Sequence, residues 1–133
     1  MATNLAPLGF GANSENFVWG AARNPLDGKR TVGSSAGAAL SLTRCVPFGI
    51  TTDFAGDSKL SAHFCGCLGF RPTPQRIDHS GNFGQVRAMS SLGPVSKHFS
   101  DLKEVVKLQI EMKAFKCWKD LEERKFKIGY VEA

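Results

Sequence analysis

Two short stretches of the sequence place serine hydroxyls among small residues, where they could carry nucleophilic chemistry. Ser34 and Ser35 follow Gly33, and Ser58 lies just after the turn Asp53–Gly56. A serine attacks a carbonyl when a neighbouring base removes its proton, and backbone N–H groups of a tight turn can stabilise the resulting oxyanion. The two stretches therefore indicate acyl transfer. Taken alone the signal is weak, because small-residue helices and glycine turns also serve plain packing.

The elements that must position these serines follow one another in a defined order. Ser35–Leu42 is typical of a small-residue helix that packs closely on neighbouring backbone. Phe48–Thr52 has the composition of a short buried strand, Asp53–Gly56 that of a turn, and Ser58–Phe64 that of a helical segment. A strand, a turn and a helix in this order present backbone N–H groups at the helix N-terminus, where an anion or a developing oxyanion can bind.

Three motifs together resemble the amidase signature family. They are the segments Gly33–Gly37, Pro47–Asp53 and Phe64–Thr73. Weaker matches extend the resemblance over nearly the whole chain. Within the family, Cys45–Ile50 and Pro72–Ile77 are most similar to the fatty-acid amide hydrolase branch. The resemblance implies an α/β fold, with a mixed sheet covered by helices. It also implies that the chain corresponds to a truncated, internal portion of the family's domain.

The resemblance implies roles for particular residues. The family cleaves carboxamides through an acyl-enzyme, with a Ser-cisSer-Lys triad and no cofactor. Ser34 matches the bridging serine, which the family holds by a cis peptide bond, a conformation that is costly and therefore marks a functional position. Phe54, Ala55 and Gly56 match the turn whose N–H groups stabilise the oxyanion.

The position of the nucleophile depends on how the register is counted. Counted forward from Ser34, Ser58 lies at the distance typical of the family. Thr52-Asp53 before the turn and Phe64-Cys65-Gly66 after it both align without a gap, and they place Asp57 in the nucleophile position. The immediate flanks set the geometry of the turn, so we favour Asp57 there and keep Ser58 as the alternative nucleophile.

Further departures from the family bear on activity. Only Lys29 precedes Ser34, and it stands in the wrong context for the base lysine, so the base is absent. Ala36 and Ala55 replace glycines where unusual dihedral angles could be required, and Val32 replaces another glycine. Ser61 stands where the family has proline. Aspartate is a poor substitute for a serine nucleophile, because its carboxylate repels an oxyanion in the same turn.

These departures leave three hypotheses. The first is a degenerate amidase, a pseudoenzyme with little or no hydrolysis by this chain alone. The second is an active hydrolase that uses Ser58 with a complementing chain that supplies the lysine. The third is a binding or scaffold module that keeps the cleft without the chemistry. The ligand expected in each case is a small amide or a lipid amide.

The C-terminal part of the chain has a different character. We expect one partial amidase-signature domain over residues 1–133, with a signature core at 1–96 and a charged, periodic segment at 97–133. Apolar residues recur at steps of three and four from Leu102 to Trp118, which predicts an amphipathic helix over about 101–123 with Ser100 as its N-cap. Lys127–Val131 is typical of the next strand, and Ser90–Pro94 of a loop over the core.

Composition narrows the classes of protein. The chain has 133 residues and a net charge of +5, but acidic and basic residues are interleaved and few aromatic residues accompany the basic ones, which argues against nucleic-acid binding. The four cysteines lack the spacing of a zinc site, so no metal is expected. The N-terminal residues do not resemble a signal peptide, and no apolar run is long enough to span a membrane. We therefore expect a cytoplasmic protein, with any membrane association limited to that implied by the lipid-amide branch.

Overall fold

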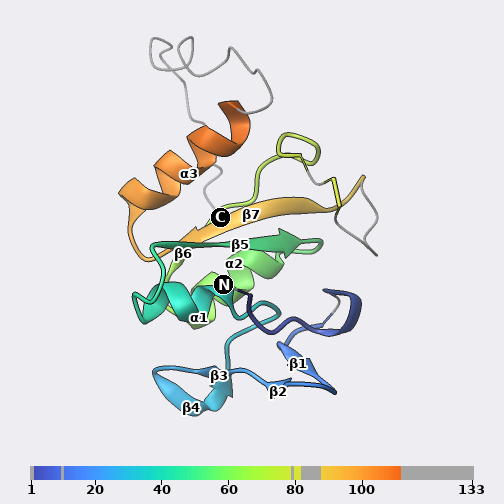
Figure 1. Cartoon of the computed structure of the whole chain (residues 1–133), viewed down its shortest axis with the longest axis vertical. Coiled ribbons are helices and arrows are strands. Elements are labelled where there is room, and N and C mark those ends of the chain that lie inside the picture. Colours follow the sequence, from blue (N-terminus) through green and yellow to red (C-terminus); the bar gives the residue numbers. More distant parts are fainter. Residues whose placement is uncertain (1, 10, 79, 82–87, 112–133) are drawn as a thin grey trace, which may run out of the picture.

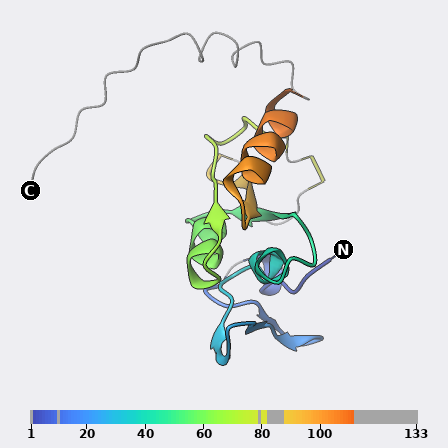
Figure 2. The same ribbon diagram turned by 90° about the vertical axis from the view of Figure 1, so that its left-hand side faces the viewer.

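The computed structural model describes residues 2–9, 11–78, 80–81 and 88–111. Its centre is a three-stranded sheet in the order β5-β7-β6, made of β5 (Phe48–Asp53), β7 (Ser91–Ser96) and β6 (Leu68–Gly69). Both pairings in this sheet are antiparallel. The helices α1 (Gly37–Leu42) and α2 (Asp57–Phe64) lie on one face, and α3 (Phe99–Glu111) lies on the other (Figures 1 and 2). The predicted α/β class is confirmed.

Two small hairpins lie at the end of the molecule opposite α3 (Figure 1). The first pairs β1 (Glu15–Asn16) with β2 (Gly20–Ala21), and the second pairs β3 (Arg23–Asn24) with β4 (Asp27–Thr31). A 3-10 turn, η1 (Pro7–Gly9), precedes them. The chain between β4 and α1 carries the Ser34-Ser35 pair from this end into the core (Figure 1).

The core is built from small side chains. Its central cluster consists of Val32, Ala36, Ala38, Ala62, Cys65 and Val95. Small residues allow close backbone approach, and a Cβ atom on Gly49 would lie 3.2 Å from the carbonyl oxygen of Gly37 in α1. The predicted close packing of this helix is thus confirmed, although α1 begins at Gly37, after the serine pair.

The strand and helix on either side of the turn agree with the sequence prediction to within one residue. The strand is less buried than expected, because Phe48 and Ile50 are 40% and 43% exposed. Thr51 and Asp53, which alternate with them, are buried. Side chains of a strand point alternately to opposite faces of the sheet, so only the face towards α1 and α2 is fully covered here.

The prediction of a loop at Ser90–Pro94 is wrong. Most of this segment is β7, the central strand, where Gly93 pairs with Thr51 and Pro94 with Ile50. Glycine and proline ordinarily interrupt strands. Here the Pro94 carbonyl still accepts a hydrogen bond from the Phe70 N–H at 3.0 Å, and Gly93 leaves room for Ser58, whose Oγ lies 2.9 Å from where a Cβ would stand.

The predicted amphipathic helix is confirmed as far as the structure describes it. Leu102, Val105 and Val106 form its buried stripe. Ser100 is not the N-cap, because α3 begins one residue earlier, at Phe99. The remainder of the predicted helix and the predicted strand Lys127–Val131 lie outside the described residues. No helix in the described ranges is long and apolar enough to cross a membrane.

Candidate active site

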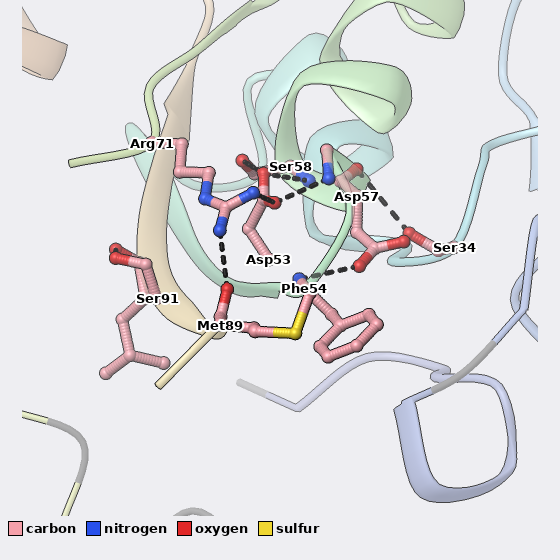
Figure 3. Close-up of polar contacts among 10 residues, drawn as sticks. Ser34, Asp53, Phe54, Asp57, Ser58, Arg71, Met89 and Ser91 are labelled. Atoms are coloured by element: carbon pink, nitrogen blue, oxygen red, sulfur yellow. Dashed lines mark hydrogen bonds and ion pairs between the residues drawn. The ribbon is translucent and has the colours of Figure 1, made fainter. Parts of the chain in front are cut away.

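The turn between β5 and α2 is organised by the carboxylate of Asp53. Its Oδ1 accepts the Gly56 N–H at 2.7 Å, and its Oδ2 accepts the Ser58 N–H at 3.1 Å (Figure 3). An aspartate that bonds backbone a few residues ahead is a common way to hold a turn. The carboxylate also fixes the first turn of α2, because N–H groups at a helix N-terminus have no partner within the helix.

The buried charge of Asp53 is balanced by Arg71. A guanidinium nitrogen, Nη1, lies 3.3 Å from Asp53 Oδ1, and Nη2 donates to the Met89 carbonyl (Figure 3). The Asp53 side chain is fully buried. A buried carboxylate is tolerated only when it is paired and hydrogen-bonded, so Arg71 and the turn N–H groups together make this position stable.

Ser58 belongs to the same buried network. Its hydroxyl donates to Asp53 Oδ2, and the residue is fully buried. It also faces Gly93 in the central strand, where a Cβ would stand only 2.9 Å from Ser58 Oγ. The structure therefore places Ser58 between α2 and the sheet and not at the mouth of a pocket. The His63 ring lies beside Phe64, at the other end of α2 from Ser58.

Asp57 faces a different environment. It is the first residue of α2, is half-buried, and its Oδ2 accepts the Phe54 N–H at 2.9 Å. Figure 3 shows this contact on the opposite side of the turn from Arg71. Phe54 and Gly56 are two of the three residues matched to the oxyanion turn, so two of its three N–H groups already donate to carboxylates of the chain itself.

Ser34 lies against this turn. Its hydroxyl donates to the backbone carbonyl of Asp57 at 3.5 Å, and the residue is buried. The fold thus brings together two positions that are 23 residues apart in sequence. The peptide bonds of Ser34 are trans, as is every bond among the described residues, so the implied cis bond is not seen.

The glycine replacements do not strain the backbone. Ala36 has φ −75°, and Ala55 is not in the left-handed region. The expectation that these positions could need unusual dihedral angles is therefore wrong. Within these two motifs the left-handed conformations fall on retained glycines, Gly33 with φ 89° and Gly56 with φ 110°.

An open pocket of about 500 Å³ adjoins the turn. Of the described residues that line it, Asp57 alone has an ionisable side chain. The remaining walls come from the turn, from α2 and from the N-terminal segment: Gly9, Gly11, Ala12, Phe54, Ala55, Gly56 and Leu60. The described lining is largely apolar and includes one carboxylate, that of Asp57.

Comparison with known proteins assigns the family. The chain matches the amidase family over residues 1–132. It belongs to the amidase family. A glutamyl-tRNA(Gln) amidotransferase subunit of Methanospirillum hungatei JF-1 is 31% identical over 105 residues, which are 77% of this chain and 24% of that protein. The same subunit from Legionella pneumophila (strain Corby) is 32% identical over 106 residues, 78% of this chain and 22% of that protein. The chain therefore spans about a quarter of the length of these relatives.

Solved structures share the fold. 6-Aminohexanoate cyclic dimer hydrolase superposes with a TM-score of 0.73 at 27% identity, over 80% of this chain and 23% of that one. Fatty acid amide hydrolase gives a TM-score of 0.71 at 24% identity, over 98% of this chain and 23% of that one, which shows a common fold. The fatty-acid amide branch is thus one of several neighbours of this amidase-family chain.

The sequence did not reveal the roles of three residues, of which two hold the turn between β5 and α2 and one holds the serine pair. Asp53 was available as a signal, because an aspartate three residues before a glycine is typical of a turn that bonds its own backbone. The pairing of Arg71 with Asp53 joins residues from separate segments of the chain, so no local sequence pattern predicts it. Ser61, noted only as a departure from proline, accepts the Ser35 N–H through its Oγ at 3.1 Å and so anchors the serine pair.

Cys65 and Cys67 do not offer another nucleophile. Burial, with a smaller contribution from Cys67, raises the pKa of Cys65 to about 11. Burial also raises the pKa of Cys67 above its usual range, partly opposed by Lys97. The reactive form of cysteine is the thiolate, so both are poorly suited to attack at neutral pH. Within the described residues no three His, Cys, Asp or Glu side chains gather as metal ligands.

Proposed function

We propose that this chain carries an amidase-type site whose nucleophile position holds Asp57, and that it does not hydrolyse carboxamides by itself. One contact carries the proposal: the 2.9 Å hydrogen bond from the Phe54 N–H to Asp57 Oδ2. In an amidase reaction this N–H would face the oxygen that becomes negative. Here a permanent negative charge already accepts it.

The remaining residues support the same conclusion. Lys29, the only lysine before Ser34 in this sequence, is exposed on β4, away from the turn in Figure 1. Ser34 lies beside the nucleophile position and could relay a proton only to a base, a role that Lys29 is not placed to fill. Members of a catalytic triad act as a unit, and losing one costs several orders of magnitude in rate.

The chemical class of the ligand follows from the pocket. Leu60 and Phe54 provide apolar wall, and the turn provides polar groups. This favours a ligand with an aliphatic chain and a polar end, of which the expected fatty-acid amide is one form. The neighbour named as a 6-aminohexanoate cyclic dimer hydrolase also acts on an aliphatic compound by its name. We also propose that the protein is located in the cytoplasm.

The test is an assay of the purified full chain. Ammonia release from hexanamide and oleamide should not exceed the uncatalysed rate, and a fluorophosphonate probe should not label the protein. Turnover or labelling at Ser58 that disappears in Ser58→Ala would overturn the proposal. The variant Ser41→Ala serves as a control for nonspecific loss of folding, because Ser41 is also a buried serine but lies in α1, where its hydroxyl donates to the Pro47 carbonyl, outside the Asp53 network.

A second candidate is an active hydrolase assembled with another chain. The observation that favours it is that the curated relatives are named as a subunit of an amidotransferase. The burial of Ser58 against Asp53 argues against Ser58 as its nucleophile. Co-purification of a partner, with amide hydrolysis that appears only in the mixture, would favour this candidate over the first.

A further inference from the structure

We infer that the pocket beside the turn binds aliphatic ammonium ions in preference to amides or carboxylates. The inference rests on the proposed function, since it takes Asp57 as the group that replaces the nucleophile. It goes further by assigning the pocket a ligand of opposite polarity to an oxyanion. Three observations support it: the unused acceptor capacity of Asp57, the occupied N–H groups of the turn, and the apolar walls.

The Asp57 carboxylate has acceptor capacity to spare. Its Oδ2 accepts one hydrogen bond, from Phe54, and its Oδ1 has no hydrogen-bond partner among the described residues. An ionised carboxylate offers about four lone-pair sites. An ammonium group has three N–H donors and a positive charge, so it can satisfy these sites with charge-assisted hydrogen bonds.

The turn is poorly prepared for an anion or a carbonyl oxygen. The Phe54 and Gly56 N–H groups donate to Asp57 and Asp53 at 2.9 Å and 2.7 Å. A carboxylate ligand would also meet the charge of Asp57 in the same pocket, and like charges in close contact repel. Two of the three N–H donors that match the family's oxyanion turn are thus occupied by the protein's own acids.

The apolar walls suit an alkyl chain. Leu60, Ala12 and Phe54 line the pocket together with the backbone of Gly9 and Gly11. A volume of about 500 Å³ lies within the range typical of small-molecule sites. A hexyl chain can therefore follow the walls while its ammonium group contacts Asp57.

One neighbouring cation works against such a ligand. The Cε of Lys59 lies 3.8 Å from where a Cβ on Gly56 would stand. Lys59 is exposed and does not line the pocket. Water and salt therefore screen its repulsion of an ammonium ligand more than they screen the attraction between that ligand and Asp57. This predicts that Lys59→Gln strengthens ammonium binding, by about twofold given the small size of exposed charge interactions.

The experiment titrates the full chain with hexylammonium chloride, hexanamide, hexanoate and hexanol, followed by calorimetry and by backbone amide NMR shifts. Hexylammonium should bind about tenfold or more tightly than the three others. The amide shifts that hexylammonium causes should centre on Phe54, Gly56 and Asp57, and its affinity should fall as the salt concentration rises. Equal affinity for hexanol and hexylammonium would overturn the inference, and that comparison needs no variant.

The matched variant is Asp57→Asn, which keeps the shape and a side-chain oxygen for the Phe54 N–H while removing the charge. It should lose at least about tenfold in hexylammonium affinity and little in hexanol affinity. Unchanged hexylammonium affinity would refute the inference. The two proposals can fail separately: hydrolysis of hexanamide refutes the proposed function, whereas absence of both hydrolysis and ammonium binding refutes only this inference.

Discussion

Asp53 and Asp57 are two carboxylates of one turn, four residues apart, and they face opposite sides of it. Asp53 points towards the sheet, where it is fully buried, paired with Arg71 and hydrogen-bonded to Gly56 and Ser58. Asp57 is half-buried, accepts one backbone N–H and lines an open pocket. The same functional group thus anchors the structure on one side, and on the other side it is the group that we propose blocks the turn and binds a ligand.

The difference shows how to distinguish a residue that stabilises the turn from a residue that acts in the pocket beside the turn. A group that satisfies several buried partners contributes to folding, and its loss leaves those partners unpaired. A group with spare acceptor capacity at a pocket contributes little to folding and much to what the pocket accepts. The following predictions apply matched changes to the two sides of the turn.

The largest effect is expected for Asp53→Asn. The substitution removes the charge that balances Arg71 and places an amide NH₂ where an acceptor is needed. We expect a loss of about 3 kcal/mol in the free energy of unfolding, at the lower end for a broken buried pair because Arg71 is partly exposed. Urea denaturation followed by circular dichroism measures it. A loss below about 1 kcal/mol would contradict the anchoring role.

The next largest loss of stability is expected in β7, the strand that packs against the sheet-facing side of the turn. In Gly93→Ala the new Cβ would stand 2.9 Å from Ser58 Oγ and closer still to the Phe70 carbonyl. Overpacking of this kind costs about 1–3 kcal/mol, and we expect a value near the upper end, because the neighbour is backbone. The control Gly28→Ala has open space around its Cβ position and should change the unfolding free energy much less. If the two variants lost the same unfolding free energy, the contact between Gly93 and Ser58 would not be tightly packed.

A smaller effect is expected for Ser58→Ala, which removes one hydrogen bond to Asp53 from the buried network. Because the carboxylate keeps Arg71 and two backbone N–H groups, the loss should be about 1–2 kcal/mol. Thermal denaturation gives this value, and fluorophosphonate labelling tests the chemistry in parallel. If the variant loses amide hydrolysis while keeping its stability, Ser58 is a nucleophile. The sheet-facing side of the turn would then not be purely structural.

The sequence predicted the local parts of this arrangement and not the long-range ones. The strand, turn and α2 follow from apolar composition, a glycine-containing turn and helix-forming residues, all of which act within a few positions. The register that placed Asp57 beside the turn N–H groups also came from immediate flanks. The pairing of Asp53 with Arg71 and the approach of Ser58 to Gly93 depend on where β6 and β7 dock, which local preferences do not determine.

The error at Ser90–Pro94 has the same physical origin. Glycine and proline were interpreted through their local preference for turns, but at this place the tertiary contact decides. Gly93 is required because α2 approaches the strand closely, and Pro94 is tolerated because its carbonyl, not an N–H, carries the bond to Phe70. Both facts become visible only when the neighbouring elements are in position.

The smallest effect on stability is expected for Asp57→Asn, the same chemical change as Asp53→Asn on the other side of the turn. The asparagine oxygen can still accept the Phe54 N–H, and the half-buried side chain has no charged partner among the described residues to leave unpaired. The lost favourable interaction of a carboxylate with the helix N-terminus amounts to about 0.3–1 kcal/mol, so the unfolding free energy should fall by no more than that. Urea denaturation of the two asparagine variants side by side gives the comparison directly. A loss as large as that of Asp53→Asn would show that both carboxylates hold the turn, because a pocket group with spare acceptor capacity cannot cost the fold as much as a buried anchor.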